Sequence, residues 1–90
     1  MAKRIDANQA AIVEALRGCG YSVAISSMMG HGYPDIAVGC RGKTLFMEIK
    51  AGSNCLTPDE REWKDNWRGS YVVVRSPEQA IREMEDFLEE

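Results

Sequence analysis

The segments 35–39 and 44–49 are apolar and β-prone, and Arg41-Gly42 lies between them. This pattern constrains the fold more than any other feature of the sequence. Two strands this close in the chain can pair only as an antiparallel hairpin, because a parallel pair needs a long crossover connection. We therefore expect a β-hairpin with a tight turn at Arg41-Gly42.

The length of that turn decides which side chains face each other across the hairpin. With a two-residue turn, Cys40 pairs with Lys43, and counting outward from this pair sets Asp35 opposite Glu48. A one-residue bulge would instead shift the register and separate the two acids.

Three other segments carry helix signals, which are a capping residue followed by apolar side chains at helical spacing. The expected helices are residues 6–18 with Asp6 and Gln9 as a capping box, a segment from Thr57 to a stop at Gly69, and a segment that starts at Ser76.

Strands are expected at 21–25 and 71–74, with a loop at 26–34. The order α-β-β-β-α-β-α follows, and the helix between the third and fourth strands favours a right-handed parallel crossover. The sequence thus predicts an α/β fold with a mixed sheet flanked by helices. Since no repeat or linker interrupts it, residues 1–90 are expected to form a single domain.

The acidic charge of the chain gathers near its end. The net charge is −3, but residues 78–90 hold six acids against one base, whereas residues 1–77 carry a net charge of +2. No strongly basic surface is visible, so we expect any binding to DNA to be weak or assisted by a metal ion.

The cysteines and the hydropathy of the sequence indicate the cellular compartment of the protein. Cys19, Cys40 and Cys55 form no C-x-x-C pair, and one His31 cannot complete a zinc site with them, so reduced thiols are expected. No apolar run approaches 18 residues, and the polar start does not resemble a signal peptide. We expect a cytoplasmic protein without a membrane span.

The hairpin brings chemistry-bearing residues together. Asp35 stands at the entry to one strand, while Glu48 and Lys50 are two apart on the other and share a face. The Cβ atoms of directly opposed residues lie about 4.5–5.5 Å apart, so two acids there repel each other, which a small domain tolerates best with a cation between them. Two carboxylates and a backbone carbonyl suit Mg²⁺ or Mn²⁺, which can generate hydroxide and neutralise a phosphate. A surface hairpin with ordinary Glu-Lys charges is the alternative.

Three segments together resemble the virus-type replication-repair nuclease (VRR-NUC) domain: Gly32-Tyr33-Pro34-Asp35, Glu48-Ile49-Lys50-Ala51-Gly52 and Leu56-Thr57-Pro58-Asp59-Glu60. That family is similar to archaeal Holliday-junction resolvases within the PD-(D/E)xK superfamily. The resemblance spans the chain from the first helix to Arg75-Ser76. It implies a restriction-endonuclease-like fold and Mg²⁺- or Mn²⁺-dependent phosphodiester cleavage. It also implies that Asp35, Glu48 and the Ile49 carbonyl bind metal and that Lys50 assists the nucleophile.

Two positions depart from the family pattern. The family usually carries Gln where this chain has Glu60, which also completes a capping box. Relatives often have an acid on the first helix, where this chain has Gln9 nearby and Glu14 as the available acid. Gln9, Glu14 and Glu60 are therefore candidate accessory residues. The sequence leaves open whether the site holds one metal ion or two.

Six basic side chains are candidate phosphate contacts, although each alone also fits a solvated surface charge. They are Arg41, Lys43, Arg61, Lys64, Arg68 and Arg75.

The expected function is a metal-dependent DNA endonuclease for four-way junctions or similar branched DNA, in bacterial or phage repair or recombination. A homodimer is expected, because junction resolution needs two cuts and one small chain has room for one site. Candidate dimer contacts are Met28, Met29, Tyr33 and Trp67. The alternative is a non-catalytic DNA- or protein-binding module that keeps the fold.

Overall fold

The structure is a computed structural model that describes the backbone of residues 3–90 and the side chains from Ala7 onward. Its elements in chain order are helix α1 (Lys3–Gly18), strand β1 (Ser22–Ile25), the short 3₁₀ helix η1 (Ser27–Met29), strands β2 (Ile36–Cys40) and β3 (Lys43–Ile49), helix α2 (Pro58–Asn66), strand β4 (Tyr71–Val74) and helix α3 (Pro77–Leu88).

The four strands form one mixed sheet in the order β1-β2-β3-β4. β1 pairs with β2 and β2 with β3 in antiparallel fashion, whereas β3 and β4 run parallel. Parallel strands cannot be joined by a tight turn, and α2 lies between β3 and β4 in the chain as their crossover. The predicted α/β fold and its element order are confirmed.

The hairpin has the two-residue turn. Cys40 pairs with Lys43, and the register continues to Ile36 opposite Met47. Arg41 and Gly42 both have positive φ, 55° and 79°, as a type I′ turn requires. The next position along this register sets Asp35, directly before β2, opposite Glu48, so the alternative with a bulge is wrong.

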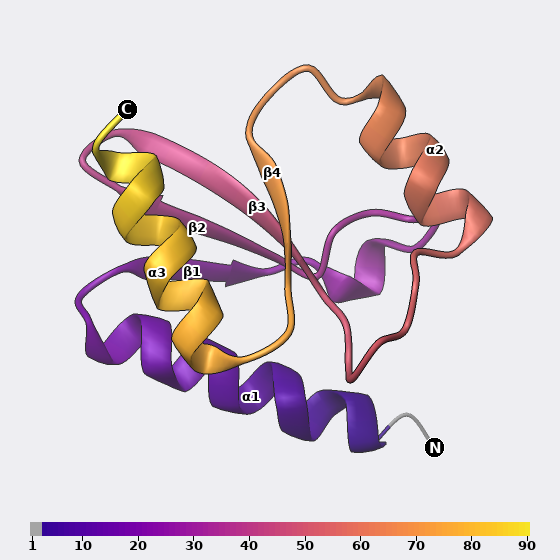
Figure 1. The fold of residues 1–90 in the computed structure, drawn as a ribbon, viewed down its shortest axis with the longest axis horizontal. Coiled ribbons are helices and arrows are strands. Elements are labelled where there is room, and N and C mark those ends of the chain that lie inside the picture. Colours follow the sequence, from indigo (N-terminus) through magenta and orange to yellow (C-terminus); the bar gives the residue numbers. More distant parts are fainter. Residues whose placement is uncertain (1–2) are drawn as a thin grey trace.

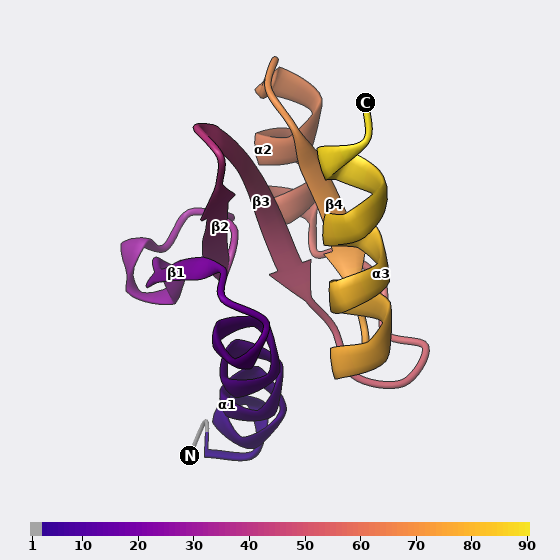
Figure 2. The same cartoon turned by 90° about the vertical axis from the view of Figure 1, so that its left-hand side faces the viewer.

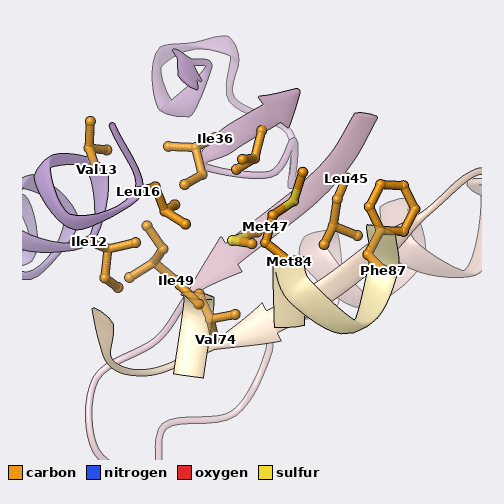
Figure 3. Packing of buried hydrophobic residues seen from close by; sticks show 12 residues of the cluster. Ile12, Val13, Leu16, Ile36, Leu45, Met47, Ile49, Val74, Met84 and Phe87 are labelled. Atoms are coloured by element: carbon orange, nitrogen blue, oxygen red, sulfur yellow. The ribbon is translucent and has the colours of Figure 1, made fainter. Parts of the chain in front are cut away.

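One face of the sheet carries the hydrophobic core. α1 and α3 contact each other and cover this face, with Ile12 and Leu16 of α1 and Met84 of α3 fully buried against Met47 (Figures 1 and 3). Apolar residues alternate along β3, and in α1 they recur at helical spacing. This explains why the apolar side chains meet on one face of the sheet.

Aromatic side chains pack on the opposite face of β3. The helix α2 lies apart from α1 in both ribbon views (Figures 1 and 2). Phe46 makes edge contacts with Tyr33, Trp63 and Trp67, and the two tryptophans stack with ring centroids 5.0 Å apart. This aromatic cluster anchors α2 to the sheet and so sets where the first turn of α2 lies.

Two predicted helix ends are wrong. α1 begins at Lys3, so Asp6 lies inside the helix rather than at its N-cap; the preceding residues contain no glycine or proline to stop the helix there. α2 ends before Gly69, because Trp67 is already extended and its N–H donates to the carbonyls of Trp63 and Lys64.

No helix within residues 3–90 has the length and apolar content that crossing a membrane requires.

Candidate active site

Asp35 is held at the start of β2 by hydrogen bonds on both of its sides. Its carbonyl accepts the Ser26 N–H at 2.8 Å, which continues the pairing of β1 with β2. Its carboxylate Oδ2 accepts the Ile49 N–H, also at 2.8 Å. Since Ile49 lies beyond the last residue of β3 that pairs with β2, the carboxylate satisfies a backbone donor that has no partner in β2.

Glu48 is buried on β3, with 3% of its surface exposed. Among the residues that the structure describes, its Oε1 atom has no hydrogen-bond partner, and its Oε2 lies 3.8 Å from the Lys50 ammonium. An unpartnered buried carboxylate oxygen is rare and costly, because the group has lost its hydration without replacement. The Glu48 carboxylate therefore keeps one buried oxygen open as an acceptor.

Burial and crowding raise the pKa values of both opposed acids. The pKa of Glu48 rises from its ordinary 4.5 to about 9, through burial first and then through the nearby Asp35 carboxylate. Burial also raises the pKa of Asp35, although the Ile49 N–H opposes this by stabilising the charged form. Two acids that resist ionisation side by side form a site that favours a cation.

Lys50 and Glu60 form a close ion pair beside these acids. The Lys50 Nζ lies 2.7 Å from Glu60 Oε1. Burial acts to raise the pKa of Glu60, but hydrogen bonds from Lys50 and from the Thr57 N–H lower it below its ordinary value. Glu60 is thus the ionised acid of the group.

The four side chains line one cleft of about 390 Å³. Its remaining lining residues are Asn8, Ile49, Ala51 and Asn54. Asp35, Glu48, Ile49, Lys50 and Glu60 were all predicted from the sequence, and the structure brings them together at the end of the sheet where β2 begins and β3 ends.

Comparison of the chain with protein-family models, curated proteins and solved structures finds no match. The function is therefore argued from this cleft alone.

The donor set of the cleft suits a small hard cation. No group of three His, Cys, Asp or Glu side chains is arranged to hold a metal within the part of the chain that the structure describes. Among the described lining residues, Asp35 and Glu48 are the acids that stay available, since Glu60 is engaged by Lys50. Mg²⁺ is commonly bound by one or two carboxylates while it keeps several waters. Two acids, one of which has an oxygen without a described partner, fit this kind of binding.

The first helix contributes a different residue from the two predicted. Gln9 donates to the Ser27 hydroxyl at 3.4 Å, and Gln9 and Glu14 line another cleft together with Ile25. Asn8 lines the cleft of Asp35 and Glu48 instead. Asn8 precedes the buried Ile12 by one helical turn, and a polar residue at that spacing is the sequence signal that could have revealed it.

Two of the basic candidates donate hydrogen bonds to distant segments of the chain, whereas Arg61 donates to the nearby Leu56 carbonyl at 3.5 Å. Lys43 donates to the Phe87 carbonyl at 2.9 Å, at the C-terminal end of α3. Arg75 donates to the carbonyls of Gly52 and Asn54, both at 2.9 Å, and so holds the loop that lines the cleft.

The other four basic candidates, Arg41, Arg61, Lys64 and Arg68, are exposed. Arg61 and Lys64 lie on α2 and Arg68 lies just beyond it, whereas Arg41 lies in the hairpin turn at the far end of β2 from Asp35.

Proposed function

We propose that this protein is a Mg²⁺- or Mn²⁺-dependent DNA endonuclease that acts on branched DNA such as four-way junctions. The observation that carries the proposal is the buried Glu48 carboxylate, which has one oxygen without a partner and stands opposite Asp35. The VRR-NUC-like spacing of Asp35, Glu48 and Lys50 agrees with it.

The roles of the side chains follow from their charges. Asp35 and Glu48 would hold the metal ion together with the Ile49 carbonyl, and the ion supplies Lewis-acid stabilisation of phosphate charge. Lys50 is the cation among the described residues that line the cleft. It would orient the attacking water and offset the charge that develops as phosphorus gains this oxygen and loses an ester oxygen.

Exposed basic side chains on and after α2 support nucleic acid as the substrate. Arg61 and Lys64 are exposed on α2, the helix whose first turn carries Glu60, and Arg68 is exposed directly after it. Phosphate contacts of this kind position a nucleic acid without reading its sequence, which fits selection by DNA shape.

The decisive experiment incubates the protein with a synthetic four-way junction and with linear duplex of matched sequence, in Mg²⁺, Mn²⁺ or EDTA. Metal-dependent cleavage with preference for the junction is expected. Lys50→Ala should lower kcat more than metal affinity, because Lys50 acts in the transition state. Absence of metal-dependent cleavage of every DNA tested would contradict the proposal.

A non-catalytic binding module is the second candidate, favoured by the lack of a three-ligand group among the described residues. Metal-linked stability discriminates the two. If the site works, Mg²⁺ or Mn²⁺ should raise the melting temperature. At a metal concentration one hundred times Kd, the gain in the free energy of unfolding is about 2.7 kcal/mol. A module without the site should show no shift.

A further inference from the structure

The Lys50 ammonium is shared unequally between two acids. It lies 2.7 Å from Glu60 Oε1 but 3.8 Å from Glu48 Oε2. The shorter distance is that of a charge-assisted hydrogen bond, and the longer one is only an electrostatic contact. Glu60, which comes from α2, therefore sets the position of a lysine that belongs to the end of β3.

Glu60 is itself held in place by the start of its helix. Its Oε1 accepts the Thr57 N–H at 2.9 Å, and its own N–H donates to the Thr57 hydroxyl at 3.2 Å, which completes a reciprocal capping box. The same Oε1 atom thus accepts from both Thr57 and Lys50. A carboxylate fixed by its own backbone is a rigid acceptor for the flexible lysine side chain.

We infer that Glu60 is a positioning residue that holds the Lys50 ammonium at the mouth of the cleft and draws it away from Glu48; this inference rests on the proposed function. Without Glu60, Lys50 would turn to the buried Glu48 carboxylate, which has an unpartnered oxygen. Lys50 would then pair with the Glu48 carboxylate, which the metal ion needs as a ligand. It would also leave the position from which it acts on the substrate.

Three variants separate this role from helix capping. Glu60→Ala removes the acceptor of Lys50 and half of the capping box. Thr57→Ala removes the other half of the box, the hydroxyl acceptor, and leaves the Glu60 carboxylate in place. Glu60→Gln has an amide oxygen that can replace Oε1. Because the Thr57 N–H needs an acceptor, this oxygen should take the position of Oε1, where it also faces Lys50.

Kinetics on the DNA substrate should order these variants by the Lys50 contact. Glu60→Ala should lower kcat by at least about tenfold with KM changed by less than about threefold, because a misplaced group affects the transition state most. Thr57→Ala should lower the melting temperature yet keep kcat within about threefold of the parent. Glu60→Gln should recover most of the rate lost in Glu60→Ala.

Metal-free protein gives a second readout that needs no cleavage. A hydrogen-bonded ammonium exchanges its protons slowly enough for a side-chain ¹⁵N–¹H signal, which Lys50→Arg would assign. The Lys50 signal should keep its chemical shift in Thr57→Ala and stay close to it in Glu60→Gln. In Glu60→Ala it should move to a different chemical shift, because the ammonium then faces Glu48 instead of Glu60. If Glu60→Ala does not fold, Glu60→Asp withdraws the carboxylate by one methylene and should move the signal in the same direction.

The inference is overturned if the Lys50 signal keeps its parent chemical shift in Glu60→Ala (or, where that variant does not fold, in Glu60→Asp), or if Thr57→Ala loses as much kcat as Glu60→Ala. If the parent protein cleaves no DNA, the proposed function fails, and the metal-free signal still decides whether Glu60 holds Lys50.

Discussion

At the scale of single residues, Asp35 and Glu48 are two opposed acids in an energetically unfavourable arrangement. They face each other across the hairpin, both have raised pKa values, and one Glu48 oxygen is unpartnered. Native proteins tolerate such local cost mainly at functional sites. Substitution of these acids should therefore harm activity and spare the fold.

The first prediction is that Asp35→Asn or Glu48→Gln lowers cleavage by at least about a hundredfold, since each would remove a charged ligand of the proposed metal ion. Both variants should be as stable as the parent or more stable in EDTA, because carboxylate repulsion is relieved and the Asn oxygen can still accept the Ile49 N–H. Urea unfolding checks this. A clear loss of metal-free stability in both would identify the acids as structural partners.

The second prediction concerns pH. The pKa of Glu48 is 4.5 ordinarily and about 9 in the folded protein, so between these values the folded state binds the extra proton. The contribution of Glu48 to the stability of the metal-free protein should therefore be fully present below about pH 4.5. It should decline as the pH rises toward 9, by at most about 1.4 kcal/mol per pH unit. Glu60, with its lowered pKa, acts in the opposite direction.

Glu48→Gln is the matched control for this pH profile, because the amide cannot ionise. Urea unfolding in EDTA from pH 5 to 9 should show a flatter profile in Glu48→Gln than in the parent. Parallel profiles would mean that Glu48 does not carry the extra proton.

At the scale of elements, the turn of the hairpin sets the register that brings Asp35 and Glu48 together. Gly42 has φ of 79° and an empty surrounding, so a methyl group there would meet no atom but would be strained by the backbone. Gly18, at the end of α1, also has open space and no positive φ.

The third prediction follows from this contrast. Gly42→Ala should destabilise the protein by about 1 kcal/mol, because a side chain disfavours the left-handed region. Gly18→Ala should be neutral or stabilise by up to about 1 kcal/mol, because alanine has less freedom to lose on folding. Thermal unfolding of both variants measures this. Equal effects of the two changes would argue against the type I′ turn.

At the scale of the whole molecule, a dimer would supply two sites and cover apolar surface. Met28 and Met29 on η1 are 71% and 57% exposed, and Trp67 is 41% exposed. Tyr33, the other candidate contact, instead packs against Phe46 and Trp63. The methionines are therefore the stronger candidates for an interface.

The fourth prediction is that light scattering at micromolar concentration gives about twice the 10.1 kDa mass of the chain. The double variant Met28→Ser with Met29→Ser should shift it toward the monomer, because it removes apolar contact area. A monomeric parent protein would remove the two-site argument, and cleavage of single strands or flaps by one site would become the better proposal.

Much of this arrangement could be predicted from local sequence, because its causes are local. A two-residue turn fixes the register by counting, so Asp35 opposite Glu48 follows from Arg41-Gly42. Strand alternation sets Lys50 on the face of Glu48, and the capping box at Thr57 follows from hydrogen bonds within four residues.

Only the tertiary structure decided which distant groups meet. Asn8 rather than Gln9 lines the cleft because the packing of α1 on the sheet sets the rotation of that helix. Glu60 reaches Lys50 because the aromatic cluster seats α2 on the second face of the sheet. Lys43 and Arg75 are drawn to backbone carbonyls of other segments. Such contacts depend on the rotation and placement of whole elements, which sequence spacing does not encode.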